Sequence, residues 1–206
     1  LIAGLRSVGG GHYAGQLFGE GIHVGAINRD CEATTVEDNT IGLAADGLTP
    51  IPTLRGILVS PFTARQTVRN TRIGGIEAGQ ANEIAGVEAQ GVMVSALIGG
   101  VTIRGNSIHD NGSLGIDLIP NSGGAGITPN DIGDADVGGN ELQNFPILTG
   151  AEAAGTMTRI TGMFNSSANQ TFTLDFYESP QCDASGIGEG ARWLGWQTVT
   201  TAEFLG

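Results

Sequence analysis

Hydrophobic and polar residues alternate over short stretches in the first two thirds of the chain, and one such stretch recurs four times. The repeated phrase consists of glycine, an aliphatic residue, a variable residue and a second aliphatic residue. It occupies residues 21–24, 56–59, 91–94 and 115–118, so that its glycines lie 35, 35 and 24 residues apart. Alternation with a period of two, bounded by Gly, Asn and Asp, predicts strands of a few residues rather than helices.

The recurrence of one strand predicts a coil in which equivalent strands stack in parallel. In such a coil the two aliphatic residues of each phrase point inward, and the core is a column of aliphatic ladders. For Ile57 and Val59, the expected neighbours in this column are Ile22, Val24, Val92 and Val94. The 24-residue spacing fits a minimal coil of three strands, whereas the 35-residue coils would carry inserted loops such as residues 44–53.

Asparagine recurs at the starts of other predicted strands. Asn39, Asn82 and Asn106 are each followed two residues later by isoleucine. Asparagine tolerates the left-handed backbone conformation and can form hydrogen-bonded ladders with its copies above and below. We therefore expect asparagine ladders at the bends of the coil. A β-sandwich with coincidental repeats is the alternative, and four in-register copies count against it.

Longer segments extend this pattern. Residues 70–75, 78–86 and 91–94 form one unit, residues 105–112 and 114–118 form a last coil, and residues 128–131, 140–146 and 182–190 follow. Together these segments resemble bacterial right-handed parallel β-helix repeat proteins. The resemblance implies a large secreted or surface-attached protein whose biochemical role is generally unassigned, and it brings no catalytic residues to this chain.

The composition changes near Phe145. Residues 1–144 contain three aromatic residues, while the remaining 62 residues contain eight. The apolar positions of 160–164 and 172–176, separated by a polar turn, predict a hairpin with one buried face. A further strand is expected at 193–199, with Trp193 and Trp196 packed in the core rather than serving as glycan-stacking platforms.

The predicted fold class is all-β. A right-handed parallel β-helix is expected over residues 1–120, an acidic Asp/Gly-rich linker over 121–144, and a small antiparallel β-sandwich-like domain over 145–206. Three or four strands are too few for a closed sandwich, so the missing strands lie beyond the fragment or come from another molecule. Residues 1–4 mirror residues 83–86, so the array is also expected to begin in mid-coil.

The net charge of −12, with nine arginines and no lysine, excludes classes of partner. Such a surface repels phosphate, so nucleic acid and anionic membranes are poor partners and cations are good ones. No apolar run is long enough to span a bilayer. Cys31 and Cys182 lie far apart in the sequence and leave both their pairing and the compartment open.

The linker carries the candidate metal site. Asp131, Asp134, Asp136 and Asn140 offer carboxylate and amide oxygens near glycines that permit a sharp turn. Hard oxygen ligands of this kind bind Ca²⁺, so calcium is the predicted cofactor. The loop lacks the closing bidentate Glu of an EF-hand, and a solvated acidic turn is the alternative.

The outward position of the repeated strand runs His23, Leu58, Met93, Asp117 up one face. Its two apolar members indicate either a contact patch or a surface covered by a loop of the same chain. His23 and Asp117 would lie about three coils apart, roughly 14 Å, too far to share a proton. The best candidates for glycoside chemistry are Asp110 and Asp117, with His109 nearby.

The favoured hypothesis is a non-enzymatic structural or adhesive protein, located outside the cell or on its surface. Both ends of the array look unfinished, and open strand edges pair with other molecules. Self-association through these edges, into a filament or a surface layer, is therefore expected. The alternative is a polysaccharide lyase or hydrolase, or a glycan-binding module, which rests on analogy with other parallel β-helices.

Overall fold

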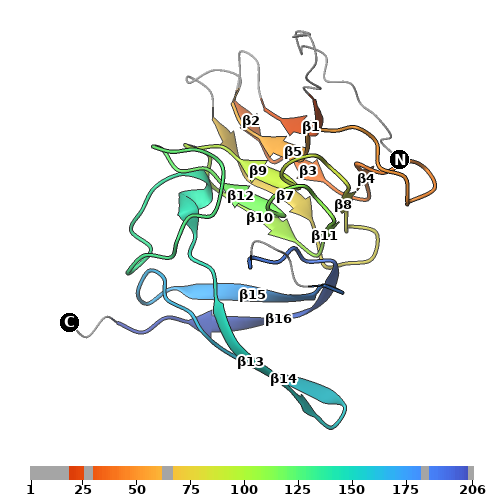
Figure 1. Cartoon of the computed structure of the whole chain (residues 1–206). Coiled ribbons are helices and arrows are strands. Elements are labelled where there is room, and N and C mark those ends of the chain that lie inside the picture. Colours follow the sequence, from red (N-terminus) through yellow and green to blue (C-terminus); the bar gives the residue numbers. More distant parts are fainter. Residues whose placement is uncertain (1–18, 26–29, 62–66, 182–185, 204–206) are drawn as a thin grey trace.

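The computed structural model describes residues 19–25, 30–61, 67–181 and 186–203, and these residues form an all-β structure. Twelve short strands up to Leu118 pair only in parallel, and four longer strands from Ile147 onward pair only in antiparallel fashion. Helix is limited, in these ranges, to one turn, η1 (Gly139–Leu142). Figure 1 shows the short strands stacked above the longer ones.

Three parallel sheets form the stack. The first contains β1 (Glu20–Val24), β5 (Arg55–Val59), β9 (Val92–Val94) and β12 (Ile116–Leu118). The second contains β3 (Thr35–Val36), β7 (Thr71–Gly74) and β10 (Val101–Arg104). The third contains β4 (Thr40–Ile41), β8 (Glu83–Ala85) and β11 (Ser107–His109). The short pair β2 (Cys31–Glu32) and β6 (Val68–Arg69) lies beside them.

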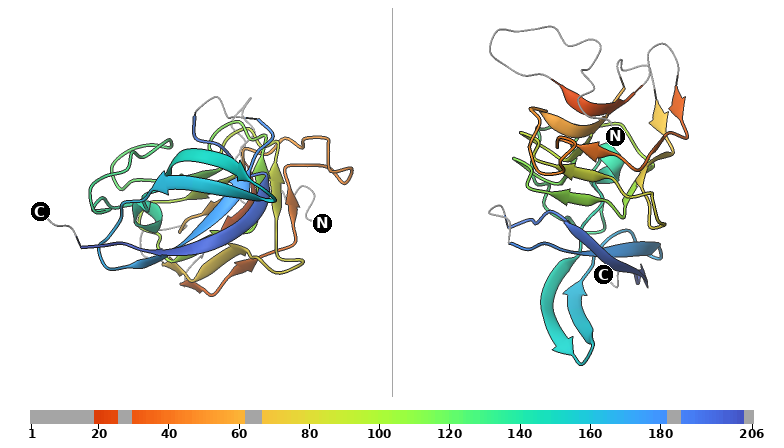
Figure 2. Two further views of the ribbon diagram at one scale, coloured as in Figure 1. Left: turned by 90° about the horizontal axis from the view of Figure 1, so that it is seen from below. Right: turned by 90° about the vertical axis from the view of Figure 1, so that its right-hand side faces the viewer.

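The chain visits the second, third and first sheets in turn, and each circuit adds one strand to each of them. One such circuit is called a coil below, and the set of coils is called the coil stack. Figure 2 shows the coils lying one above another. All-β class and parallel sheets are therefore as predicted.

The aliphatic ladders occupy the predicted positions. Ile57 pairs with Ile22 on one side and Val92 on the other. Val59 likewise pairs with one residue in each neighbouring coil. Ile57, Val59 and Val92 are fully buried, and they belong to one continuous hydrophobic core. Burial of each such side chain contributes about 1.5–3 kcal/mol relative to exposure, so this column stabilises the coil stack.

The glycine of the repeated phrase has a steric role. A Cβ added at Gly91 would lie 2.7 Å from the carbonyl oxygen of Gly115 and 2.8 Å from Cγ2 of Ile108. A Cβ at Gly56 would collide with the carbonyl oxygen of Gly91. Glycine at this position therefore lets the backbone of one coil approach the backbone of the next.

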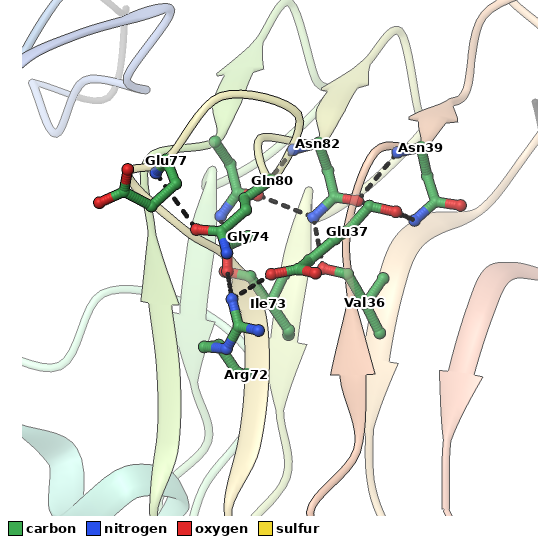
Figure 3. A network of polar contacts seen from close by, with 10 residues as sticks. Val36, Glu37, Asn39, Arg72, Ile73, Gly74, Glu77, Gln80 and Asn82 are labelled. Atoms are coloured by element: carbon green, nitrogen blue, oxygen red, sulfur yellow. Dashed lines mark hydrogen bonds and ion pairs between the residues drawn. The ribbon is translucent and has the colours of Figure 1, made fainter.

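The expected asparagine ladder is present inside the coil stack. Nδ2 of Asn39 donates to Oδ1 of Asn82 at 2.8 Å, and Nδ2 of Asn82 donates to Oδ1 of Asn106 at 2.8 Å. The main-chain N–H groups of Asn39 and Asn82 donate to the same two oxygens. Figure 3 shows Asn39 and Asn82 side by side, with Val36 accepting a further bond from Asn82. The ladder satisfies polar groups that would otherwise be costly to bury.

Two hairpins follow the coil stack. β13 (Ile147–Ala154) pairs with β14 (Met157–Met163), and β15 (Thr171–Glu178) pairs with β16 (Arg192–Thr200). The predicted hairpin between residues 160–164 and 172–176 is therefore wrong, because these segments belong to different two-stranded sheets. Their apolar side chains still meet, since the rings of Phe164 and Phe172 lie 5.0 Å apart in an edge-to-face arrangement.

One end of the coil stack is covered, which corrects the expectation of open edges at both ends. The β15–β16 hairpin lies across the end formed by β10, β11 and β12, and β13–β14 projects beyond it (Figures 1 and 2). Ile108 of β11 donates its main-chain N–H to the carbonyl of Gly190 at 2.9 Å. The expected mid-coil start falls on residues 1–4, which lie outside the described residues.

The glycine contacts between coils predict a steric penalty at Gly56. Gly56→Ala should lower the free energy of unfolding by about 1–3 kcal/mol, because its Cβ forces neighbouring coils apart. Gly99→Ala is the matched control, since nothing lies within 4 Å of a Cβ at Gly99. Chemical denaturation monitored by far-UV circular dichroism measures both. Equal stability of the two variants would contradict the close approach.

Candidate functional site

The acidic loop between β12 and β13 brings three of the four predicted metal ligands together. Oxygen atoms of Asp131, Asp134 and Asp136 all lie within 4.8 Å of one another. Gly133 and Asp134 have positive φ angles of 77° and 59°, and these reverse the chain so that the carboxylates converge. A cluster of this size offers hard oxygen donors to a divalent cation.

Asp134 is the best anchored of the three carboxylates. Its Oδ1 accepts a hydrogen bond from the main-chain N–H of Asn144 at 2.8 Å. Its Oδ2 accepts hydrogen bonds from Nε2 of Gln143 at 2.8 Å and from Oγ of Ser166 at 2.5 Å. Asp134 therefore links the acidic loop to the segment between β14 and β15.

The backbone of the loop is held by a buried asparagine. Oδ1 of Asn144 accepts the N–H of Asp131 at 3.1 Å, and Nδ2 donates to the carbonyls of Asp131 and Asn165. The carboxylate of Asp131 also accepts the N–H of Ala135. The sequence carried no signal for Asn144, Asn165 or Ser166, because their partners lie 10 to 32 residues away.

Asp136 is the least compensated carboxylate of the cluster. Its Oδ1 is buried and has no hydrogen-bond partner within the described residues. Burial raises the pKa of Asp136, and repulsion from Asp131 and Asp134 raises this pKa further. A proton or a bound cation would relieve this accumulation of negative charge.

The fourth predicted ligand, Asn140, lies elsewhere. Its Oδ1 accepts the main-chain N–H of Val101 at 2.9 Å, and its Nδ2 donates to the carbonyl of Val101 at 3.0 Å. The side-chain amide therefore pairs with β10 as a neighbouring strand would. Asn140, Glu141 and Leu142 all have left-handed backbone conformations, which asparagine tolerates better than most residues.

Asp117 is buried, although it occupies the outward position of β12. Its Oδ2 accepts hydrogen bonds from Nε2 of Gln90 at 3.1 Å and from the N–H of Gly126 at 3.0 Å. Its Oδ1 is buried and unpartnered within the described residues. Burial raises the pKa of this carboxyl, and the hydrogen bonds from Gly126 and Gln90 and the charge of Arg55 oppose that rise.

Asp110 has a different environment from Asp117. Its side chain is 87% exposed, and its Oδ2 lies 2.7 Å from Nδ1 of His109. Asp110 has a φ of 54°, which is a turn conformation that aspartate commonly adopts. Asp110 and Asp117 share no hydrogen-bonding partner in the described part of the chain.

The remaining candidates occupy separate places. In the outward row, Nε2 of His23 lies 2.8 Å from Oγ of Ser60, while Leu58 and Met93 are half-buried. Cys31 is a free thiol that lies 3.0 Å from the hydroxyl of Thr34. Cys182 lies outside the described residues.

Trp193 and Trp196 differ in burial and partners. Trp193 is half-buried and donates its indole N–H to Asp175 at 3.0 Å, whereas Trp196 is 52% exposed. The prediction that both tryptophans pack in the core therefore holds for Trp193 in part and not for Trp196.

Comparison with known proteins gives no relative for this chain: no family model, no curated protein and no solved structure matches it. Within the described ranges, no helix has the length and apolar character needed to cross a membrane.

The burial of Asp117 predicts a pH effect. Its pKa is raised in the folded protein, so its contribution to stability is present below the unfolded pKa of about 3.9 and is lost as the pH rises through the folded pKa. Asp117→Asn lacks this loss and should gain stability relative to the unmodified chain as the pH rises above about 4. Urea midpoints measured across pH test this. Asp110→Asn is the control for an exposed carboxylate, and a pH-independent Asp117→Asn difference would contradict the prediction.

Proposed function

We propose that the coil stack is a right-handed parallel β-helix and that the protein is a non-enzymatic structural or adhesive module outside the cell. The observation that carries this proposal is the in-register stacking of equivalent residues from coil to coil. Ile22, Ile57 and Val92 form one such row, and Asn39, Asn82 and Asn106 form another. Each coil contacts its neighbours, which favours a stiff spacer.

The environment of the acidic residues supports a structural role over polysaccharide hydrolysis. A glycosidase pair needs two carboxylates that both face the substrate. Asp117 is covered by Gly126 and Gln90, whereas Asp110 is exposed in a turn. The net charge of −12 without lysine favours solubility and cation binding in an extracellular setting.

We further propose that the two hairpins belong to an incomplete β-sandwich. Large apolar side chains are exposed on them, and an isolated two-stranded hairpin is marginally stable in water. The most exposed are Leu148 at 60%, Met157 at 73%, Met163 at 65% and Trp196 at 52%. Additional strands from outside this segment, or from a second molecule, would cover these residues, and the hairpin edges are the proposed route of self-association.

Calcium binding is proposed at Asp131, Asp134 and Asp136. The three carboxylates converge within 4.8 Å, and Asp134 ties the loop to Ser166. A cation at this cluster would neutralise the charge that raises the pKa of Asp136. It would also fix the loop between the coil stack and the hairpins.

Isothermal titration tests the calcium site. The protein should bind Ca²⁺ with a Kd on the order of 0.1–1 mM, the range of extracellular calcium modules. An Asp134→Ala, Asp136→Ala variant should give no saturable heat, and Asp136→Asn alone should weaken binding about tenfold, because one charged ligand is lost. The Glu77→Ala, Glu88→Ala variant removes two exposed carboxylates elsewhere and should bind normally. Equal heats from the protein and the double aspartate variant would refute the site.

Sedimentation velocity, negative-stain electron microscopy and a glycan screen test the structural role. The expected result is elongated particles with concentration-dependent association and no turnover of uronate-containing or neutral glycans, with or without Ca²⁺. Turnover that disappears in Asp110→Ala or Asp117→Ala would overturn the proposal in favour of an enzyme. Discrete monomers under all conditions would remove the self-association component.

A further inference from the structure

The outer edge of β11, on the side away from the coil stack, is occupied by residues 189–191 of the same chain. On its inner side, Ser107 donates its N–H to the carbonyl of Asn82 in the preceding coil at 2.8 Å. On its outer side, Ile108 donates its N–H to the carbonyl of Gly190 at 2.9 Å. Oγ of Ser107 also donates to the carbonyl of Ala191 at 2.7 Å. Gly190 therefore takes the place that a strand of a further coil would have.

Glu189 accepts hydrogen bonds from the last coil at the position where a residue of a further coil would lie. Within the ladder, the main-chain N–H and Nδ2 of Asn82 both donate to the side-chain oxygen of Asn106 in the next coil. In the last coil, Asn111 belongs to a different row, in which its Oδ1 accepts the N–H of Val87 from the preceding coil at 3.2 Å. Asn111 donates its N–H to Oε2 of Glu189 at 3.1 Å and its Nδ2 to Oε1 of Glu189 at 2.8 Å. The same two kinds of donor are satisfied, but by a residue from the hairpin connection.

The column of glycines between coils ends at the same residue. A Cβ at Gly91 would meet the backbone of Gly115 in the next coil at 2.7 Å. A Cβ at Gly115 would meet Cγ and Cα of Glu189 at 3.3 and 3.5 Å. The connection thus lies against the last coil at the position of a further coil.

A partly buried ion pair holds this connection against the coil stack. Arg104 at the end of β10 donates to both oxygens of Asp175 on β15, at 2.6 and 2.7 Å. Nε1 of Trp193 donates to the same carboxylate, and the hydroxyl of Tyr177 accepts the N–H of Gly105 at 2.8 Å. Paired, planar hydrogen bonds of this kind give both strength and orientation.

We propose that residues 189–191, held in place by β15–β16, are a built-in terminator that closes a coil-docking surface. The occupant that this surface would otherwise accept is a second copy of the chain, through the end formed by β1, β3 and β4. Among the described strands, each of these pairs on one side only. The terminator prevents head-to-tail stacking, which would generate an open filament. This inference rests on the proposed stacking of coils as a β-helix.

Hydrogen exchange and sedimentation velocity on the whole chain test the terminator. An Asp175→Ala, Glu189→Ala variant should speed exchange at the amides of Ile108 and Asn111 by about tenfold or more, because charge-assisted hydrogen bonds are lost. It should also form larger species than the unmodified chain at equal concentration. Glu178→Ala is the matched control, since it removes an exposed partner of Arg192 on the same hairpin and should change neither result.

The milder variant Glu189→Gln keeps an acceptor oxygen for Asn111 and should raise exchange at both amides by about threefold. Unchanged exchange in both variants would overturn the inference, and so would faster exchange without larger species. Protection at the amides of Ile57 and Val92, which bond to the next coil, reports the coil stack separately. If these two amides are not protected in the unmodified chain, the proposed stacking of coils itself is refuted.

Discussion

The close approach of neighbouring coils at the glycine of each repeated phrase is the constraint on which the structure depends. At Gly56 and Gly91 no side chain separates one coil from the next, so the coils lie at the spacing of main-chain hydrogen bonds, about 4.8 Å. The strand residues of a coil are then held over their equivalents. The aliphatic rows and the asparagine ladder both follow from this spacing.

The same spacing creates unsatisfied groups wherever the stacking stops. Side chains supply the missing partners at the covered end: Asn140 pairs with β10 and Glu189 with the last turn. Asp175 and Tyr177 fix the hairpin that carries Glu189. The acidic loop adds a second link, because Asp134 bonds to Ser166 beyond β14. The hairpins are thus joined to the coil stack by polar contacts.

Local periodicity was sufficient to predict the inside of the coil stack. The inward positions of Ile57 and Val59 and the asparagine ladder follow from the repeat, because equivalent residues must coincide when coils stack. The hairpin pairing was not predictable in this way. β13 has the sequence Ile-Leu-Thr-Gly-Ala-Glu-Ala-Ala, which does not alternate between apolar and polar residues. Its pairing with β14 therefore could not be predicted from the sequence.

The candidate site shows the same division. Three aspartates close together in the sequence also lie close together in space, since a short glycine-containing loop permits little else. Asn140 has the right chemistry for a ligand, but its side-chain amide is already bonded to the main chain of Val101 through both its oxygen and its nitrogen. The anchors Asn144 and Ser166 depend on how distant segments meet.

The rows of equivalent residues in the coil stack also govern how such a chain can change in length. Inside the coil stack, each residue of a row bonds or packs against its equivalent in the neighbouring coil, so a strand cannot gain or lose a single residue without displacing a whole row. Segments between strands, such as residues 44–53, are free of that condition. The coil stack therefore grows or shrinks by complete circuits, and its length is counted in steps of one strand spacing.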